Sequence, residues 1–316
     1  MQPPATRIAF LLIDNYSLMA FASAMEPFRQ ANRLAGRQLY EWWVCSISGE
    51  SVQCSANIRT DAEYSIDSTP LPDLLLIISG DSKPLQNEAE VHKRLRILAG
   101  QGCWLGGLSV GSYILARAGV LDEHKCTVHW EYLESFKEQF PRLDITGELF
   151  EIDGARLTCS GGSACMDLML NYIAANHGRE LSRRVAEVFI HERVRDNNDQ
   201  QRQPLRTRLG VSHPKLLHCL ELIEQDTDVV LMQNELAEKV GLSNRQLERL
   251  FQKYLHTTPS RYCMDHRLRR ARSMLRNTSR SIIDIAVACG FSSHSHFSKS
   301  YRDHFSITPN NDRLSA

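Results

Sequence analysis

Two segments near the carboxyl end of this chain repeat one another, and the repeat constrains the fold more than any other feature. The first copy spans Leu236–Pro259 and the second spans Ile285–Pro309. The residues that correspond in the two copies are Leu236 and Ile285, Ala237 and Ala286, Gly241 and Gly290, Ser243 and Ser293, Leu247 and Phe297, Phe251 and Tyr301, and Pro259 and Pro309. Each copy combines a short helix, a glycine turn, a serine suited to N-capping and a second amphipathic helix. This order is typical of a helix-turn-helix, so two copies predict a chain that reads two successive stretches of one DNA face.

The two motifs are predicted at about residues 233–256 and about residues 282–305. The second helix of each buries one apolar stripe and leaves its polar face open to DNA. The side chains predicted to contact DNA are Asn244, Arg245, Glu248, Arg249, His294, Ser295, Ser298 and Lys299. Arginine and asparagine pair bidentately with the edges of guanine and adenine. A helical bundle with a solvated basic face is the competing interpretation, and the alignment of two copies disfavours it.

The charge distribution supports a nucleic-acid partner for the carboxyl-terminal part. The whole chain has 37 basic and 37 acidic residues, but the residues from Pro214 onward carry 15 Lys and Arg against 11 Asp and Glu. Between Leu236 and Arg280 the excess rises to 11 basic against 3 acidic residues. A locally basic module attached to a mildly acidic body is typical of a protein that binds double-stranded DNA through one domain.

The cysteines and the hydropathy predict a reduced, cytoplasmic protein. Nine cysteines are dispersed without a C-x-x-C pair or the ligand spacing of a zinc site, which favours free thiols. No leader or long apolar run is apparent, so we expect no membrane association. His294 and His296 diverge at their spacing on a helix, so neither a metal site nor a cofactor is expected.

The amino-terminal part alternates apolar strand patterns with helical patterns, which predicts a doubly wound, flavodoxin-like α/β domain over residues 1–192. The strands are predicted at 7–13, 42–47, 74–78 and 103–108, with a hairpin at 148–159. The helices are predicted at 16–34, 91–98, 112–118, 166–175 and 181–191. A polar stretch without periodicity predicts a linker at 193–213. The all-α DNA-binding domain then covers 214–316 and holds both helix-turn-helix motifs.

One motif in the α/β domain has the pattern of a nucleophile elbow. Gly107-Leu108-Ser109-Val110-Gly111 follows a predicted strand and opens a helix, and His129 lies farther along the chain. A hydrolase or amidohydrolase that uses Ser109 and His129 is therefore one hypothesis. The simpler interpretation is that any doubly wound fold needs a tight strand-to-helix turn at this place.

The carboxyl-terminal hundred residues resemble the AraC/XylS family of transcription regulators. The motifs that carry the resemblance are Ser243–Phe251, Thr258–Tyr262, Arg267–Arg272, Asp284–Phe291 and His296–Phe305. The resemblance implies that bases are contacted by Arg245, Glu248 and Arg249 in the first copy and by Ser295, Ser298 and Lys299 in the second. The family's usual glycine before the closing Pro is replaced by His256-Thr257 and by Ser306. Asn-Asn-Asp-Arg after Pro309 also departs from the family, which predicts a frayed carboxyl end.

The amino-terminal part resembles the PfpI-like, class I glutamine-amidotransferase-like fold. In those enzymes the elbow residue is a cysteine, which corresponds here to Ser109, and a glutamate lies early in the helix after the first strand. The matching stretch Ser17–Ala24 contains no acid. The resemblance therefore implies a domain without enzymatic activity. Motifs typical of regulators that fuse this domain to an AraC module are Ala24–Asn32, Leu115–Leu121, Cys159–Gly162 and Asp167-Leu168.

The former active-site crevice is predicted to bind a small-molecule effector, because ligands in open α/β sheets bind beyond the carboxyl ends of the strands. The residues expected near this pocket are Asp14, Gly80, Asp81, Ser109, Val110, His129 and Trp130. Backbone N–H groups at the Ser109 turn would receive a carboxylate, and Trp and acidic side chains would receive a cation. An amino acid or a quaternary amine meets both requirements, and related regulators sense arginine, betaine and carnitine. The expected function is an effector-controlled transcription activator, with RNA polymerase and a second copy of the chain as candidate partners.

Overall fold

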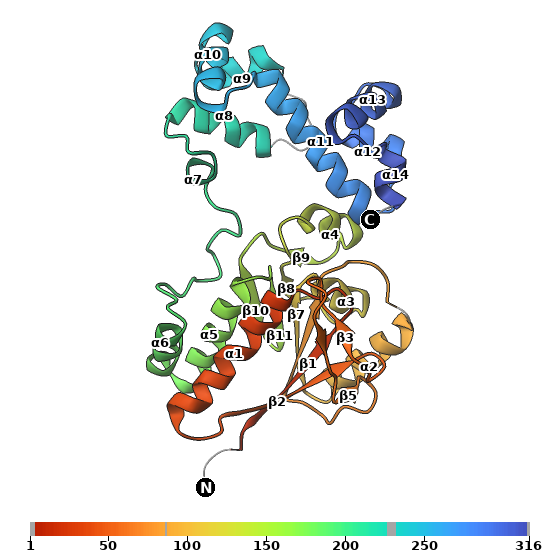
Figure 1. Cartoon of the computed structure of the whole chain (residues 1–316), viewed down its shortest axis with the longest axis vertical. Helices are drawn as coiled ribbons and strands as arrows, with labels where there is room; N and C mark the ends of the chain where they lie inside the picture. The colour runs from red at the N-terminus through yellow and green to blue at the C-terminus, as the bar shows by residue number, and fades with distance from the viewer. Residues whose placement is uncertain (1–3, 86, 226–231, 315–316) are drawn as a thin grey trace. The chain divides into compact units, whose positions relative to one another are not determined.

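The computed structural model describes residues 4–85, 87–225 and 232–314 and divides the chain into two compact units, Met1–Gln201 and Arg202–Ala316 (Figure 1). The first unit is an α/β domain and the second is all-helical. None of the helices in the described ranges is long and apolar enough to cross a membrane.

The α/β unit is built on one seven-stranded sheet with the strand order β10-β11-β7-β6-β1-β2-β5. All neighbouring strands are parallel except β10 and β11, which form an antiparallel hairpin. The strands of this sheet are β1 (Thr6–Leu12), β2 (Tyr40–Ser46), β5 (Tyr64–Ser65), β6 (Leu74–Ser79), β7 (Trp104–Ser109), β10 (Phe150–Asp153) and β11 (Arg156–Cys159). The strand order reverses between β1 and β6, which confirms the predicted doubly wound topology.

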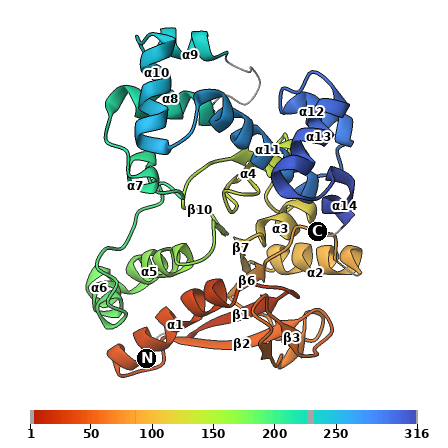
Figure 2. The ribbon, with the colours of Figure 1, turned by 45° about the horizontal axis from the view of Figure 1, so that its top comes forward.

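Helices cover both faces of the sheet, as a doubly wound fold requires. The helices of the α/β unit are α1 (Leu18–Ala35), α2 (Glu88–Gly100), α3 (Ser112–Arg117), α4 (Leu133–Gln139), α5 (Ala164–His177) and α6 (Arg179–Val188). Figure 2 shows α1 and α5 on one side of the central strands and α2 and α3 on the other. Five two-residue strands escaped prediction along with α4. β3 (Val52–Gln53) pairs with β4 (Arg59–Thr60) and β8 (Lys125–Cys126) pairs with β9 (Asp144–Ile145) outside the main sheet, and β5 is an edge strand of the main sheet.

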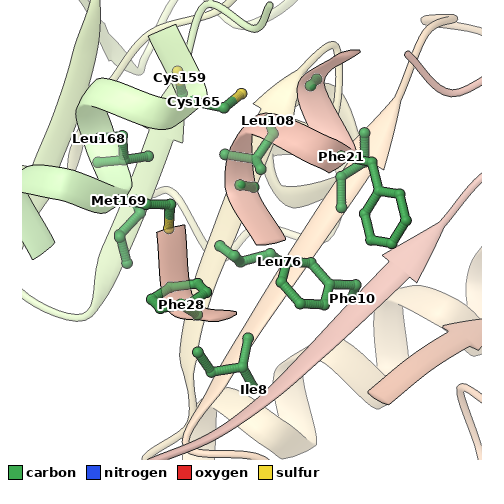
Figure 3. Close-up of a cluster of buried hydrophobic side chains, with 14 of the residues drawn as sticks. Ile8, Phe10, Phe21, Phe28, Leu76, Leu108, Cys159, Cys165, Leu168 and Met169 are labelled. Carbon is green, nitrogen blue, oxygen red and sulfur yellow. The ribbon is translucent and has the colours of Figure 1, made fainter. Parts of the chain in front are cut away.

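Two cores form because side chains of a strand alternate between the faces of the sheet. From β1, Ile8 and Phe10 enter the core under α1 and α5, whereas Ala9 and Leu11 enter the core under α2 and α3. Figure 3 shows the first core, where Phe28 of α1 lies beside the strand side chains. All five residues are fully buried. Burial on both faces explains why these strands read as continuous apolar runs in the sequence.

The second unit has two helical cores that share one long helix. The helices of this unit are α7 (Leu205–Leu209), α8 (Pro214–Gln225), α9 (Gln233–Lys239), α10 (Asn244–Leu255), α11 (Pro259–Asn277), α12 (Ile282–Ala288), α13 (His294–Phe305) and α14 (Pro309–Leu314). Leu216, Leu236 and Phe251 belong to the first core, and Leu268 and Phe297 belong to the second. The start of α11 packs on the first core and its later turns pack on the second. The connecting helix therefore belongs to both halves of the unit.

Residues 193–213, the predicted linker, make contacts within each of the two units. Residues 193–201 pack on the α/β unit, where the Gln201 side-chain amide donates to the backbone oxygens of Val128 and Glu148 at 3.1 and 2.8 Å. Leu149 donates a backbone hydrogen bond to Asn197 at 2.8 Å. Farther along, α7 packs on α8 through the second unit's first core. Long-range polar contacts of this kind leave no periodic signal in the sequence, so the stretch looked like a loop.

Candidate DNA-binding surface and sensor pocket

The first helix-turn-helix is formed by α9 and α10. Gly241 between them has φ of +62°, a conformation that glycine adopts without strain. Ser243 caps α10, because its hydroxyl accepts from the Gln246 N–H at 3.3 Å while the Gln246 side chain accepts from the Ser243 N–H at 2.9 Å. Leu247 and Phe251 are fully buried. The predicted turn, cap and apolar stripe are confirmed, and the opposite face of α10 is left exposed.

The second helix-turn-helix, α12 and α13, repeats this construction. Gly290 has φ of +71°, and the Ser293 hydroxyl accepts from the His296 N–H at 3.2 Å. Phe297 and Tyr301 are fully buried in the second core. The two copies therefore share turn, cap and buried stripe, and differ mainly in the side chains that their open faces carry.

The side chains predicted to contact DNA lie on these open faces. Seven of them are exposed and Ser298 is half-buried; the exposed ones are Asn244, Arg245, Glu248, Arg249, His294, Ser295 and Lys299. Glu248 accepts a hydrogen bond from Gln233 at 2.9 Å, and Ser298 contacts His294 at 3.4 Å. His296 lies instead against the ring of Phe291, with 5.7 Å between ring centroids, so the two histidines have different neighbours. Contacts between these side chains and bases stay predictions.

Several arginines of α11 hold the second motif together rather than forming an open basic surface. Arg267 Nε donates to the Cys289 carbonyl at 2.6 Å and its guanidinium also bonds to Gly290, while Arg270 donates to Ala288 at 3.2 Å. These carbonyls lie at the carboxyl end of α12, where a cationic side chain interacts favourably with the helix dipole. The Arg267 guanidinium carbon also lies 4.3 Å from the centroid of the Phe291 ring. Part of the local basic excess is thus structural.

The carboxyl end is anchored rather than frayed, which corrects the expectation from its sequence. Asp312 in α14 is fully buried and pairs with Arg272 at 2.8 Å and with Arg276 at 2.6 Å. The Tyr301 hydroxyl donates to the same carboxylate at 2.7 Å. Burial alone would raise the Asp312 pKa, but the hydrogen bonds from Tyr301 and the two arginines lower it below its usual value. This carboxylate joins α11, α13 and α14.

Both recognition helices end in a left-handed residue that is not glycine. His256 has φ of +52° and Ser306 has φ of +59°, and both are exposed. We expect Ser306→Gly to raise the stability of the DNA-binding unit by about 0.5–1 kcal/mol, because glycine occupies this conformation without strain. Arg302→Gly, in the exposed interior of the same helix, should lower stability by a similar amount. Urea unfolding measures both, and equal destabilisation by the two variants would contradict the cap assignment.

Ser109 sits in a strained turn at the end of β7. Its φ is +61° and it is almost completely buried. Glycines leave room for this turn: a β-carbon on Gly111 would approach the Ile77 carbonyl oxygen to 2.3 Å, and one on Gly161 would approach the Ser109 Cβ to 2.7 Å. The elbow geometry predicted from Gly107 to Gly111 is therefore present. Strain of this kind persists where the surroundings enforce it, commonly at binding or catalytic sites.

His129 lies beside this turn, and its ring Nδ1 is 3.8 Å from the Glu131 carboxylate. Its backbone N–H donates to the Ser109 carbonyl at 3.4 Å, and its Nδ1 accepts from the Glu131 N–H at 3.4 Å. Within the described residues, no hydrogen bond joins the Ser109 hydroxyl to the His129 ring. Burial lowers the His129 pKa, an effect that the nearby Glu131 carboxylate opposes. The helix after β1 has no acid in its first turn, so the acid of PfpI-type enzymes has no counterpart there.

The remaining predicted pocket residues follow the carboxyl ends of the strands, close to where β1, β6 and β7 end. Asp14 follows β1 and is exposed, Gly80 and Asp81 follow β6 and are half-buried, and Trp130 is 39% exposed. The Val110 N–H, expected to receive a ligand carboxylate, instead donates to the Ser79 carbonyl at 3.2 Å. A neighbouring donor is also used, since the Gly111 N–H donates to the Leu108 carbonyl at 3.0 Å. Binding of a ligand carboxylate at this turn stays a prediction, and these two N–H groups already have partners.

Sequence reasoning singled out Asp167 only as part of a family motif and missed its role. Its carboxylate is fully buried and contacts His191 at 2.7 Å and Arg195 at 2.6 Å. Arg195 also donates its backbone N–H to Asp167 at 2.8 Å. These bonds hold the segment that follows α6 against α5. The only sequence signal was an acid at an apolar position of a helix.

Comparison with known proteins decides the family. Residues 6–175 match the DJ-1/PfpI family, and residues 236–314 match a helix-turn-helix domain family. The HTH-type transcriptional regulator GbdR of Pseudomonas aeruginosa is 46% identical, over 98% of this chain and 86% of its own length. The chain belongs to the AraC-type transcriptional regulators. The regulator CdhR of the same species is 42% identical, over 96% of this chain and 90% of its own length.

Solved structures agree with this assignment. An AraC family transcriptional regulator from Pseudomonas putida superposes with a TM-score of 0.54 at 31% identity, over 58% of this chain and 99% of that one. A ThiJ/PfpI family protein from Pseudomonas syringae gives a TM-score of 0.54 at 16% identity, over 70% of this chain and 87% of that one, which shows the fold alone. This regulator therefore carries a DJ-1/PfpI-type domain in front of an AraC-type DNA-binding domain.

Proposed function

We propose that this regulator is an effector-controlled transcription activator whose DJ-1/PfpI-type domain binds a small molecule without turning it over. The observation that carries the proposal is the turn at Ser109. The chain forms a strained, glycine-lined elbow at the carboxyl end of β7, but among the described residues no hydrogen bond joins the Ser109 hydroxyl to the His129 ring. A hydroxyl reacts only when a positioned base takes its proton and a third group orients that base.

The predicted pocket residues supply a chemistry for the effector. Asp14 and Asp81 provide carboxylates and Trp130 provides a partly exposed aromatic face at the same edge of the sheet. Carboxylates and an aromatic face recognise a cation, such as an amino acid's ammonium group or a quaternary amine. Because the Val110 and Gly111 N–H groups already have partners, we propose that the cationic end of the effector dominates recognition. The regulator is proposed to act in the cytoplasm as a homodimer that recruits RNA polymerase.

A thermal-shift screen of small amines and amino acids against the full-length protein tests effector binding, because a ligand that binds only the native state raises its melting temperature. A compound that shifts the melting temperature should also change affinity for a cognate duplex. The proposal fails if amines and amino acids leave both quantities unchanged.

We expect the second unit to bind DNA without the first. Residues 202–316 should bind duplex DNA in a gel shift, with affinity that falls steeply as salt rises, because phosphate contacts release counterions. Residues 1–201 should not bind. DNA affinity confined to the amino-terminal fragment would overturn the assignment of the recognition helices.

The second candidate function is a hydrolase that uses Ser109 and His129. The elbow backbone favours it, and so does the closeness of the two residues, since the His129 backbone N–H donates to the Ser109 carbonyl. We expect Ser109→Ala to weaken effector binding by roughly 0.5–1.5 kcal/mol, the net value of one hydrogen bond, and to leave DNA affinity without effector unchanged. Isothermal titration calorimetry and a duplex titration measure the two effects. An acyl-Ser109 adduct with an activated ester, together with turnover that Ser109→Ala abolishes, would establish the hydrolase instead.

A further inference from the structure

An isoleucine occupies the least favourable backbone position at the end of α6. Ile190 has φ of +55°, where a β-branched side chain is a genuine outlier. The His191 N–H reaches back to the Ala186 carbonyl at 3.0 Å, which is the helix ending that normally places glycine at this position. The other described non-glycine residues at positive φ are all polar: Asn15, Asn57, Asn87, Ser109, Glu123, His256 and Ser306.

Folding of the α/β unit gains nothing from this isoleucine. Its side chain is 87% exposed, more than any other large apolar side chain in the described part of the chain. Strain and exposure both cost free energy, and glycine or asparagine would avoid both. Val188, one turn earlier, is 40% exposed. An apolar projection maintained at such a cost points to a surface that is covered in the working protein.

A groove lies directly beside this projection. It has a volume of about 740 Å³ and is lined by residues of α5, α6 and the segment that follows. Its apolar lining comes from Leu170, Ala174, Ala186, Ile190 and Val194. The segment 190–196 forms one wall, and Asp167 holds that wall to α5 through His191 and Arg195. The groove is therefore preformed. Figures 1 and 2 show α6 at the flank of the α/β unit, beside α5.

Some of the charges along the groove are paired within α6, because Arg183 forms ion pairs with Glu180 at 3.0 Å and with Glu187 at 3.4 Å. Arg179 lies at the start of α6, whereas Glu192 and Asp196 come later along the same lining. No ion pair is formed by the Arg179, Glu192 or Asp196 side chains within the described residues. One surface thus carries a projection, a groove that accepts an apolar side chain, the Arg179 cation toward one end and the Glu192 and Asp196 carboxylates toward the other.

These four features complement a second copy of themselves. In a two-fold interface the same patch meets itself in the opposite direction, so a projection must meet a groove and a cationic end must meet an anionic end. We propose that the α6 surface (residues 179–196 with their α5 neighbours) joins two copies of the chain, with Ile190 of each copy lodged in the groove of the other. This inference rests on the proposed homodimer and assigns its interface.

Sedimentation velocity of the full-length protein over a concentration series tests the interface. The wild type should reach twice its mass of 36.0 kDa. Ile190→Asn, which suits positive φ, and Ile190→Glu should each raise the dimer dissociation constant about 30-fold or more, the size of an interface hot spot. Ile58→Glu, at a 52% exposed isoleucine between β3 and β4, is the matched control and should leave dimerisation unchanged.

A charge exchange adds an independent test. Arg179→Glu and Glu192→Arg should each weaken the dimer, and the double variant should recover most of the wild-type affinity because the two ends still complement each other. A wild-type protein that stays monomeric, or Ile190 variants that dimerise normally, would overturn the interface. Effector and duplex titrations of the same variants report separately on the proposed function.

Discussion

Replacement of Asp312 by asparagine is expected to destabilise the DNA-binding unit by about 3 kcal/mol, because two guanidinium groups would lose the one carboxylate that pairs them. The side chain is fully buried and joins α14 to Arg272, Arg276 and Tyr301. Urea unfolding monitored by circular dichroism measures the change. Asp303→Asn, on the exposed surface of α13, is the matched control and should stay within about 0.5 kcal/mol of the wild type.

The same carboxylate predicts the direction of acid sensitivity. The pKa of Asp312 is lower in the folded protein than its ordinary value of 3.8. Its contribution to stability is therefore fully present above that ordinary value and is lost as the pH falls toward the folded pKa. The stability of the wild type should decline over this acidic range more steeply than that of Asp312→Asn. Parallel pH profiles for the two proteins would show that folding does not lower the Asp312 pKa.

Arg249→Ala is expected to relax sequence preference at one base pair by about 1–3 kcal/mol, if the guanidinium pairs bidentately with a guanine. Arg249 is exposed on the open face of α10, two turns from the Ser243 cap. Binding of the variant to a library of single-base duplex variants measures the change position by position. The loss should be confined to the base pairs under the first motif.

The control for Arg249 is another exposed arginine outside the recognition helices. Arg269 lies on α11, so Arg269→Ala should reduce affinity for all duplexes by a similar factor and should lower the salt dependence. Arg270 is unsuitable as a control because it bonds to the end of α12. Identical specificity profiles for the Arg249 and Arg269 variants would show that α10 does not read bases through Arg249.

The regular elements were predictable because their signals are local. The strand at β6 is an unbroken apolar run, Leu74–Ile78, and burial on both faces of a parallel sheet produces such runs. The helix-turn-helix motifs were predictable at nearly residue level because turn glycines, capping serines and apolar spacing all agree. The two-residue strands such as β3 carry too few side chains to show any period.

The features that sequence reasoning missed depend on contacts between distant residues. Asp312 pairs with Arg272 and Arg276, which lie far from it in the sequence, and no local pattern predicts this pairing. Asp167 likewise fastens a segment that reads as a linker. At the elbow, the pattern predicted the Ser109 backbone, but whether its neighbouring N–H groups were free depended on their bonds to Ser79 and Leu108. Hydrogen-bond partners of this kind follow from the fold and leave no local pattern.

The two helix-turn-helix motifs of one chain are expected to read two successive stretches of DNA. Hydroxyl-radical footprinting of the full-length regulator on a duplex selected from a random library tests it most directly. Each bound copy should protect two stretches on one face of the duplex, separated by about one helical turn, or roughly 10 base pairs. Arg249→Ala should weaken protection of one stretch and Lys299→Ala the other. A single protected stretch that both substitutions weaken equally would contradict the account.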